Sequence, residues 1–395
     1  MTINFDMTGK LVPVKDTEKF KGYEEVKYNS GWINRTLNFN VISGNNRFML
    51  RTRGGKFEDE HNDIYVFSKG GLDENGKQIK GEGFRIPFKE RLIHKRLPEV
   101  VEWKKFIVDL EEPGHRWKIQ NAIEKLEDGH DFSEDELDEF GVKSADELKD
   151  VLEKSNKKRK EFISEWDYAE YLHKVLTSEK YKDRMFNIKG EYVMEYSEAK
   201  NQWYSHYAPT RIYLAAKDAE PVATATVTLF YDESGLDDGV VEEKNKYYLN
   251  GYVQVYDSNK KKNVFAPYTV AIPVEDNKKK MKKIVEILSV DDGVKELGMI
   301  VDLIDGSEMK EIEMEDLDLE TQDLILCGLV DFEDVKHQMG GNVYGSRVTE
   351  NRFKKFSRNY STGAKETVYT SDDLHNVSAE DDSDDLFGDD DDLFA

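Results

Sequence analysis

Two segments of this chain carry basic and aromatic residues but no acidic ones. Residues 26–56 contain no Asp or Glu, although a chain with 81 acidic residues in 395 would place about six there. Residues 199–217 lack acids as well. Cations attract a phosphate backbone, and aromatic rings offer faces on which bases stack. The two segments therefore indicate a surface for a phosphate-bearing polymer.

The candidate binding residues are the basic, aromatic and amide side chains of these segments. They are Tyr28, Trp32, Arg35, Asn38, Arg47, Arg51, Arg53, Lys56, Lys200, Trp203, Tyr204, His206, Tyr207 and Arg211. The plain alternative is a solvated hairpin whose aromatic residue covers the edge of a core. Many of the tyrosines must be core residues, so both interpretations stay open for individual side chains. A third segment, 244–270, is similar in composition, with Asp257 as its only acid.

The first segment is predicted to be a β-hairpin with one apolar face. A two-residue turn at Asn45-Asn46 would pair Val41 with Leu50. Strand alternation then assigns the apolar residues to one side and the polar ones to the other. The apolar side carries Ile33, Leu37, Phe39, Val41, Phe48 and Leu50. The opposite side carries Trp32, Asn34, Thr36, Asn38, Asn40, Arg51 and Arg53.

The rest of the composition favours a binding protein over an enzyme. The net charge is −24, and the single cysteine, Cys327, allows no disulfide framework and no Cys-based zinc site within one chain. The histidines are scattered, and no nucleophile–base pair or phosphate-binding glycine loop stands out. No apolar run is long enough to span a membrane, and no signal peptide is visible. We therefore expect no catalysis, no cofactor, no metal and no membrane partner, in a reducing cytosol.

The fold class predicted from the pattern is mixed β with an α insertion. We expect an OB-type β-barrel interrupted by a helical insertion, a second small β-rich domain and a disordered acidic tail. Within the insertion, Ser133 with Glu136 and Ser144 with Glu147 fit the capping box that begins a helix. The expected parts are residues 1–235 with the insertion at about 98–180, a second domain at 236–340, a flexible basic-aromatic linker at 341–379 and the tail at 380–395.

The tail combines acidic residues with two apolar anchors. Nine of the residues 380–395 are acidic, and Asp-Asp-Leu-Phe occurs twice. Like charges keep such a segment from folding alone, and an acidic run by itself acts as a solubiliser. The apolar pairs instead indicate anchors for a partner's pocket with a basic rim. The candidate partner-binding residues are Asp384, Asp385, Leu386, Phe387, Asp391, Asp392, Leu393 and Phe394.

The acidic tail ending in Asp-Leu-Phe, behind a basic-aromatic β body, resembles the single-stranded DNA-binding proteins encoded by tailed bacteriophages. The start of the chain, from Asn4-Phe5-Asp6 through the Trp32 hairpin, is similar to them too. The resemblance implies OB-type folds and non-catalytic coating of single-stranded DNA in phage replication and recombination. It also implies tail contacts with polymerase, primase-helicase or recombination factors, in the cytoplasm of the infected bacterial host. Two departures are the missing zinc-site cysteines and the long helical insertion.

A different class of function competes with this one. An acidic assembly protein or a DNA mimic would use its aromatic strands to bind another protein, with no nucleic-acid binding. A mimic has no reason to exclude acids from its aromatic hairpins, so the placement of charge favours binding of single-stranded DNA.

Overall fold

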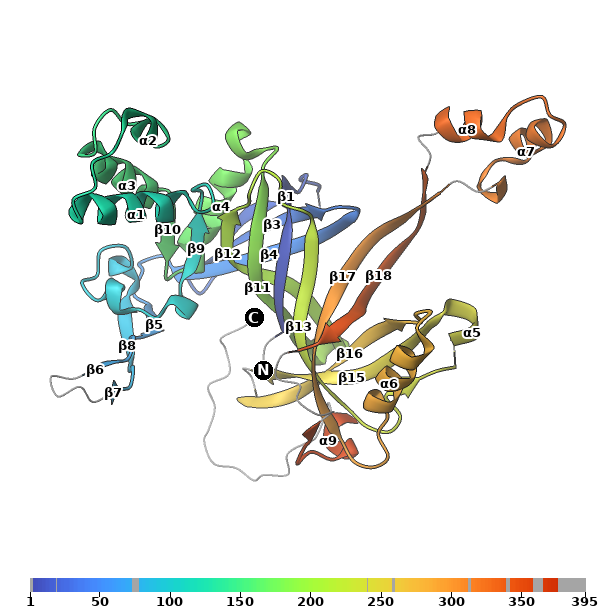
Figure 1. Ribbon diagram of the computed structural model, residues 1–395. Helices are drawn as coiled ribbons and strands as arrows, with labels where there is room; N and C mark the ends of the chain where they lie inside the picture. The colour runs from blue at the N-terminus through green and yellow to red at the C-terminus, as the bar shows by residue number, and fades with distance from the viewer. Residues whose placement is uncertain are drawn as a thin grey trace, which may run out of the picture. The chain divides into compact units, whose positions relative to one another are not determined.

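A computed structural model describes residues 3–18, 20–72, 78–239, 241–257, 260–311, 314–338, 342–357 and 365–375 (Figure 1). These residues fall into two compact units. The larger unit comprises 3–227 and 300–355, and the smaller comprises 228–299 and 356–375. The domain boundary predicted from the sequence lies at residue 235, whereas the two units divide at residue 227 and the chain returns to the larger unit after residue 299. No helix in these ranges is long and apolar enough to cross a membrane.

The larger unit contains most of the sheet and the helical insertion. Its strands are β1 (Ile3–Pro13), β2 (Tyr23–Lys27), β3 (Trp32–Ser43), β4 (Asn46–Phe57), β5 (Asp63–Phe67), β6 (Gly71–Leu72), β7 (Gln78–Ile79), β8 (Gly83–Pro87), β9 (Phe106–Asp109), β10 (Arg159–Phe162), β11 (Met185–Ser197) and β12 (Gln202–Leu214). Its helices are α1 (His115–Glu127), α2 (Glu134–Asp138), α3 (Glu147–Lys157), α4 (Glu165–Leu176), α7 (Leu319–Leu326) and α8 (Phe332–Gln338).

The smaller unit is built on a long hairpin of two strands. Its elements are β14 (Leu236–Asp237), α5 (Val241–Lys244), β15 (Lys246–Asp257), β16 (Lys262–Pro273), α6 (Lys278–Leu288), β19 (Lys365–Glu366) and α9 (Ser371–His375). Three further strands have residues in both units: β13 (Val222–Tyr231), β17 (Lys295–Glu311) and β18 (Asn342–Phe356).

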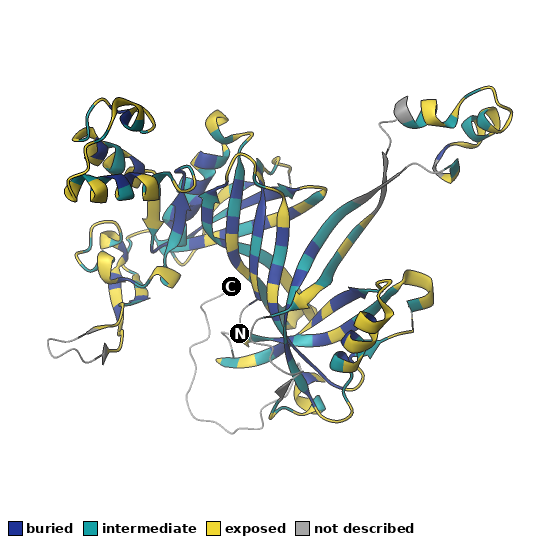
Figure 2. Cartoon of the chain, viewed as in Figure 1, coloured by how far each residue is buried: buried dark blue, intermediate teal, exposed yellow. Residues whose placement is uncertain are grey.

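Five strands of the larger unit pair in a closed circuit. β1 pairs antiparallel with β3 and with β11, while β11 pairs with β12 and β3 with β4. The circuit closes where β12 runs parallel to β4 at Tyr207 and Leu50. Phe5, Phe39 and Phe48 are among the core side chains buried in these strands. Figure 2 shows buried residues along β1 and β11. The sheet-rich fold with a helical insertion, predicted from the sequence, is present.

The register of the β3–β4 hairpin differs from the predicted one. Ser43 pairs with Asn46, so the turn residues are Gly44 and Asn45 rather than Asn45 and Asn46. Gly44 has a φ of 59°, a left-handed conformation that glycine adopts readily. Val41 consequently faces Phe48 instead of Leu50. The partner shifts by two residues, and because side chains alternate with period two, both faces keep their predicted residues.

The helical insertion is present, with two short strands that the sequence did not predict. β9 and β10 pair with each other, and β9 also pairs with β12. The capping box of Ser133 and Glu136 begins α2 as predicted. The second predicted box is wrong, because α3 begins only at Glu147 after a turn in which the Glu147 N–H donates to the Ser144 carbonyl.

Helix α4 covers the apolar face of the hairpin and is held there by Arg35. The Arg35 guanidinium lies over the Trp166 ring, 3.8 Å from its centroid. It donates to the Trp166 carbonyl at 2.8 Å, to Glu170 at 3.0 Å and to Glu25 at 2.7 Å. Gly54 lies against the start of α4, where a side chain would collide with the Trp166 backbone. A buried cation needs such partners, so Arg35 serves the fold.

The predicted flexible linker is wrong for its described parts. Residues 342–356 form β18, in which Arg347 pairs with Asp305 at 2.7 Å and Lys354 with Asp302 at 2.8 Å. Opposite charges on β17 and β18 therefore favour an ordered strand over a free basic arm. In the smaller unit, α9 buries Leu374 fully against Phe230 and Phe265. The acidic tail, residues 380–395, lies outside the described residues.

Candidate nucleic-acid interface

The circuit of strands brings the two acid-free segments to one surface. His206 of β12 lies close enough to Arg51 and Arg53 of β4 for their positive charges to lower the pKa of its imidazole. Alternation assigns Tyr204 to the same face as His206, and Trp32 and Asn38 of β3 to the same face as the two arginines. We call the group Trp32, Asn38, Arg51, Arg53, Tyr204 and His206 the β3–β4–β12 surface.

The cations of this surface have no carboxylate partner in the described part of the chain. Arg51 and Arg53 form no ion pair there, nor does Arg47 on the same face of β4, whereas the nearby Lys27 pairs with Glu58 at 2.6 Å. Arg47 and Arg53 are exposed and Arg51 is half-buried. In a chain of net charge −24, three guanidiniums left without acids make a local site for anions.

Buried amides hold the arginines in place. Nε of Arg51 donates to Oδ1 of Asn38 at 3.1 Å, and Nδ2 of Asn38 donates to the Lys21 carbonyl at 3.0 Å. The Asn34 amide fits best with its oxygen 2.9 Å from Nη2 of Arg53. These amides were expected on an exposed face, but Asn34 and Asn38 are buried and position the guanidiniums.

An aromatic cluster borders the arginines, and the sequence revealed only part of it. The half-buried Trp32 indole packs directly on Gly55, and any side chain at position 55 would collide with the indole ring. Phe57 packs edge-on to Trp32 at 5.1 Å, and His61 stacks on Phe57 at 4.2 Å. In the observed register Trp32 pairs with Phe57. A predicted turn at Gly44-Asn45 would therefore have added Phe57 to the candidate binding residues.

The β11–β12 hairpin contributes rings on both of its faces. Lys200 lies over the exposed Tyr204 ring, 5.6 Å from its centroid. Trp203 belongs to the opposite face and packs on Tyr196 at 5.3 Å. Tyr207 points inward, edge-on to Phe5 at 5.3 Å, and burial raises the pKa of its hydroxyl.

Several candidate residues are thus located away from the β3–β4–β12 surface. Arg35 and Lys56 lie on the face covered by α4, where Lys56 pairs with Glu60 at 2.6 Å. Tyr207 is half-buried and packs edge-on to Phe5 and Phe48 of the core, and Arg211 is positioned beside β9. We remove Arg35, Lys56 and Tyr207 from the candidate set, because a partner of this surface could not reach them. Asn38 is buried too and stays only as the amide that positions Arg51. The exposed Tyr28 begins the turn before β3 and remains a candidate. The predicted partner-binding residues of the tail lie outside the described residues.

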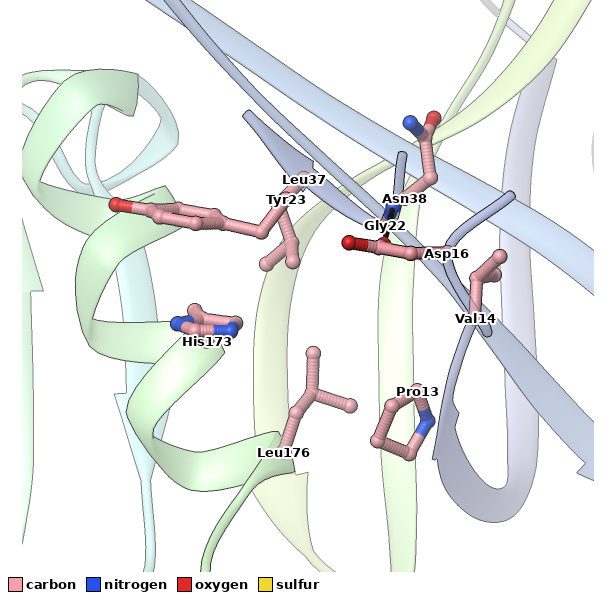
Figure 3. A pocket seen from close by; sticks show the side chains of 9 residues that line it. All are labelled: Pro13, Val14, Asp16, Gly22, Tyr23, Leu37, Asn38, His173 and Leu176. Carbon is pink, nitrogen blue, oxygen red and sulfur yellow. Dashed lines mark hydrogen bonds between the residues drawn. The ribbon is translucent and has the colours of Figure 1, made fainter. Parts of the chain in front are cut away.

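A pocket of about 180 Å³ lies where α4 meets β2 and β3 (Figure 3). His173 and Leu176 of α4 face Pro13 and Asp16 across it, and His173 stacks on Tyr23 with ring centroids 4.1 Å apart. Burial lowers the pKa of the His173 imidazole. The lining side chains include one carboxylate but no Lys or Arg, so the pocket does not suit a phosphate group.

The pKa of His206 depends on the two arginines of β4. Burial of the imidazole, then the charge of Arg51, lowers the pKa of His206, and Arg53 acts in the same direction while Glu195 opposes them. A histidine pKa below its unfolded value disfavours protonation in the folded state. His206 therefore contributes stability above the unfolded pKa, and this contribution is lost as the pH falls.

We predict that Arg51→Gln raises the pKa of His206 toward the ordinary histidine value, because it removes a repelling cation. An NMR titration of the His206 ring protons in wild type and variant measures this directly. Lys149→Gln, an exposed substitution on α3, is the control and should leave the titration unchanged. Equal His206 pKa values in wild type and Arg51→Gln would contradict the proximity of β4 and β12.

No family model matches the chain, and no curated protein matches it. Among solved structures, the wild-type single-stranded DNA binding protein from Thermus aquaticus aligns with a TM-score of 0.29 and 8% identity, over 77% of this chain and 85% of that chain. A deletion mutant of the same protein aligns with a TM-score of 0.28 and 8% identity, over 77% and 86%. At these values the likeness supports neither a fold assignment nor a function for this chain.

Proposed function

We propose that this chain binds single-stranded DNA on the β3–β4–β12 surface, without reading its sequence and without catalysis. One observation carries the proposal: arginines without acidic partners gather beside aromatic rings from two distant acid-free segments. Guanidiniums follow a phosphate backbone, and rings such as Trp32 and Tyr204 offer faces to any base. The side-chain amides of Asn38 and Asn34 hold Arg51 and Arg53 in place. Because these amides are occupied in this way, they do not present hydrogen-bond donors that would distinguish one base from another.

The strand circuit supports an OB-type interpretation of the larger unit. In order along the chain, its five strands are β1, β3, β4, β11 and β12, and the third runs parallel to the fifth. OB-folds are partly open five-stranded barrels that bind oligonucleotides with strands two and three and with the loop joining strands four and five. The corresponding elements here are β3, β4 and the β11–β12 hairpin, which carry the candidate surface.

The proposed setting and partners rest on the sequence resemblance. The chain would coat and protect single-stranded DNA during phage replication and recombination in the bacterial cytoplasm. The acidic tail would recruit replication proteins through Phe387 and Phe394. Helix α9 ties the chain to the smaller unit just before the tail, since Leu374 is buried and His375 lies 3.2 Å from Asp232.

A salt titration tests the proposed surface. The logarithm of the affinity for oligo-dT should fall linearly with the logarithm of salt concentration, with a slope of roughly −2 to −5 for several contacts. The double variant Arg51→Gln/Arg53→Gln should make this slope shallower by about 1.4, at 0.7 per lost contact. Fluorescence anisotropy of a labelled oligo-dT gives both slopes.

The control and the rival function are read in the same titration. Lys149→Gln/Lys154→Gln removes the same charge from the exposed face of α3 and should leave the slope unchanged. A wild type that binds no oligo-dT at low salt would favour the acidic assembly or mimic protein. Binding with an unchanged slope in the arginine variant would locate the DNA elsewhere.

Deletion of residues 380–395 tests the tail. The deletion removes nine acidic residues and changes the formal charge from −24 to −15. A flexible acidic arm competes with DNA for basic groups, so the truncated protein should bind oligo-dT more tightly, above all at low salt. Phe387→Ala/Phe394→Ala keeps the charge, so it should retain the competition and lose binding to replication proteins. Unchanged DNA affinity after truncation would exclude competition, and retained partner binding in the double variant would leave the tail a solubiliser.

A further inference from the structure

Helix α7 and the residues after it expose leucines to solvent. Leu319, Leu326 and Leu329 are 79%, 75% and 74% exposed, and no residue of α7 is buried. Figure 2 shows α7 in the colours of exposed and intermediate residues. Leu319 and Leu326 are seven residues apart and so lie on one helix face, the spacing with which a helix docks on a partner. Exposed apolar groups gathered in this way mark an interaction site.

The same segment is strongly acidic. Residues 317–336, which we call the acidic tip, contain six acidic residues and one basic residue, Lys336. Asp323 lies between Leu319 and Leu326 along the exposed helix and is itself exposed. Such a charge repels a phosphate backbone, so the tip suits an apolar surface with basic residues around it.

The chain itself offers a surface of that chemistry. Residues 88–96, which we call the basic turn, contain four basic residues and one acidic residue. At its apex Leu92 and Ile93 are 61% and 82% exposed. Lys89 and Lys95 flank them, are exposed, and form no ion pair with any residue that the structure describes.

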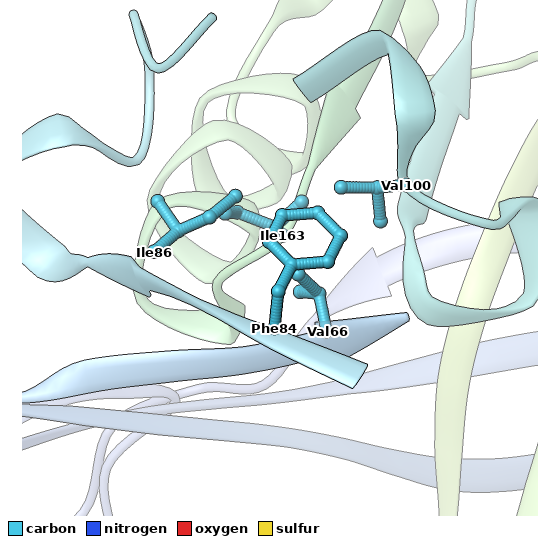
Figure 4. Close-up of a cluster of buried hydrophobic side chains, with 5 residues drawn as sticks. All are labelled: Val66, Phe84, Ile86, Val100 and Ile163. Carbon is cyan, nitrogen blue, oxygen red and sulfur yellow. The ribbon is translucent and has the colours of Figure 1, made fainter. Parts of the chain in front are cut away.

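The basic turn is rigidly held, which lowers the entropic cost of binding. It follows β8, whose Phe84 and Ile86 pack with Val66, Val100 and Ile163 in a small core (Figure 4). Phe88 is fully buried and lies under the Arg91 guanidinium at 4.0 Å. Arg91 also donates to Asp167 of α4 at 2.7 Å.

From these two surfaces we propose that the acidic tip of one copy docks on the basic turn of a second copy. Leucines of α7 meet Leu92 and Ile93, while tip carboxylates meet Lys89 and Lys95. The two surfaces differ, so the contact is heterologous and repeats from copy to copy into a linear array or a ring. The contact needs no nucleic acid. Cooperative coating of a strand by such an array rests on the proposed function.

Sedimentation velocity of the full chain at increasing concentration tests the contact. The wild type should associate with a rising sedimentation coefficient, less so at high salt because the charge attraction is screened. Lys89→Glu/Lys95→Glu and Leu319→Ser/Leu326→Ser should each remain monomeric. These positions are exposed, so the fold should persist, and circular dichroism checks this. Lys149→Glu/Lys154→Glu, with the same charge change on α3, should associate like the wild type.

A charge swap identifies the two surfaces as partners. Glu320→Lys/Asp323→Lys alone should be monomeric, but the quadruple variant that also carries Lys89→Glu/Lys95→Glu should associate again, because only its two reversed surfaces are available to pair. A wild type that is monomeric at every concentration would overturn the inference. A quadruple variant that stays monomeric, or a Lys89→Glu/Lys95→Glu variant that associates normally, would overturn it as well.

DNA binding is measured separately, with an oligo-dT too short for two copies. Wild type and Lys89→Glu/Lys95→Glu should bind it equally, because the basic turn is not part of the β3–β4–β12 surface. If the proteins associate but none binds the oligonucleotide, the proposed function fails while the contact between copies stands.

Discussion

The pairing of β12 with β4 is the constraint on which the candidate surface depends. One parallel pair, Tyr207 with Leu50, closes the circuit of five strands. In the closed circuit the Tyr207 ring points inward and packs on Phe48, while His206 points outward beside the arginines of β4. Without it, the two acid-free segments would be separate hairpins with a few cations each. With it, they form one surface of guanidiniums and rings.

The inner face of the β3–β4 hairpin stabilises the fold, and its outer face carries the candidate binding surface. On the inner face Arg35 is enclosed by Trp166, Glu170 and Glu25, and it fixes α4 over the sheet. On the outer face Arg51 and Arg53 have amide partners but no carboxylate partners in the described ranges. A neutral amide orients a guanidinium without cancelling its charge, so the outer arginines keep their attraction for anions.

The faces of the hairpin could be predicted from the sequence, because side chains alternate with period two. An error of two residues in the register therefore left every residue on its predicted face. Arg35 could not be assigned, since Glu170 is 135 residues away along the chain. Strand β18 looked like a free basic arm, because its acidic partners Asp302 and Asp305 belong to another strand. The closure through β12 was equally hidden, as it depends on one long-range pair. Local pattern thus predicted the faces, and tertiary contacts decided which cations remain available.

Photocrosslinking with an oligo-dT that carries 5-bromodeoxyuridine tests the central claim most directly. Bromouracil crosslinks to aromatic side chains in contact with it, and mass spectrometry of the digest identifies the peptides. The β3–β4–β12 surface predicts crosslinks in the peptides that contain Trp32, Tyr204 and His206, with loss of signal at high salt. Crosslinks confined to other peptides, or none at low salt, would contradict it.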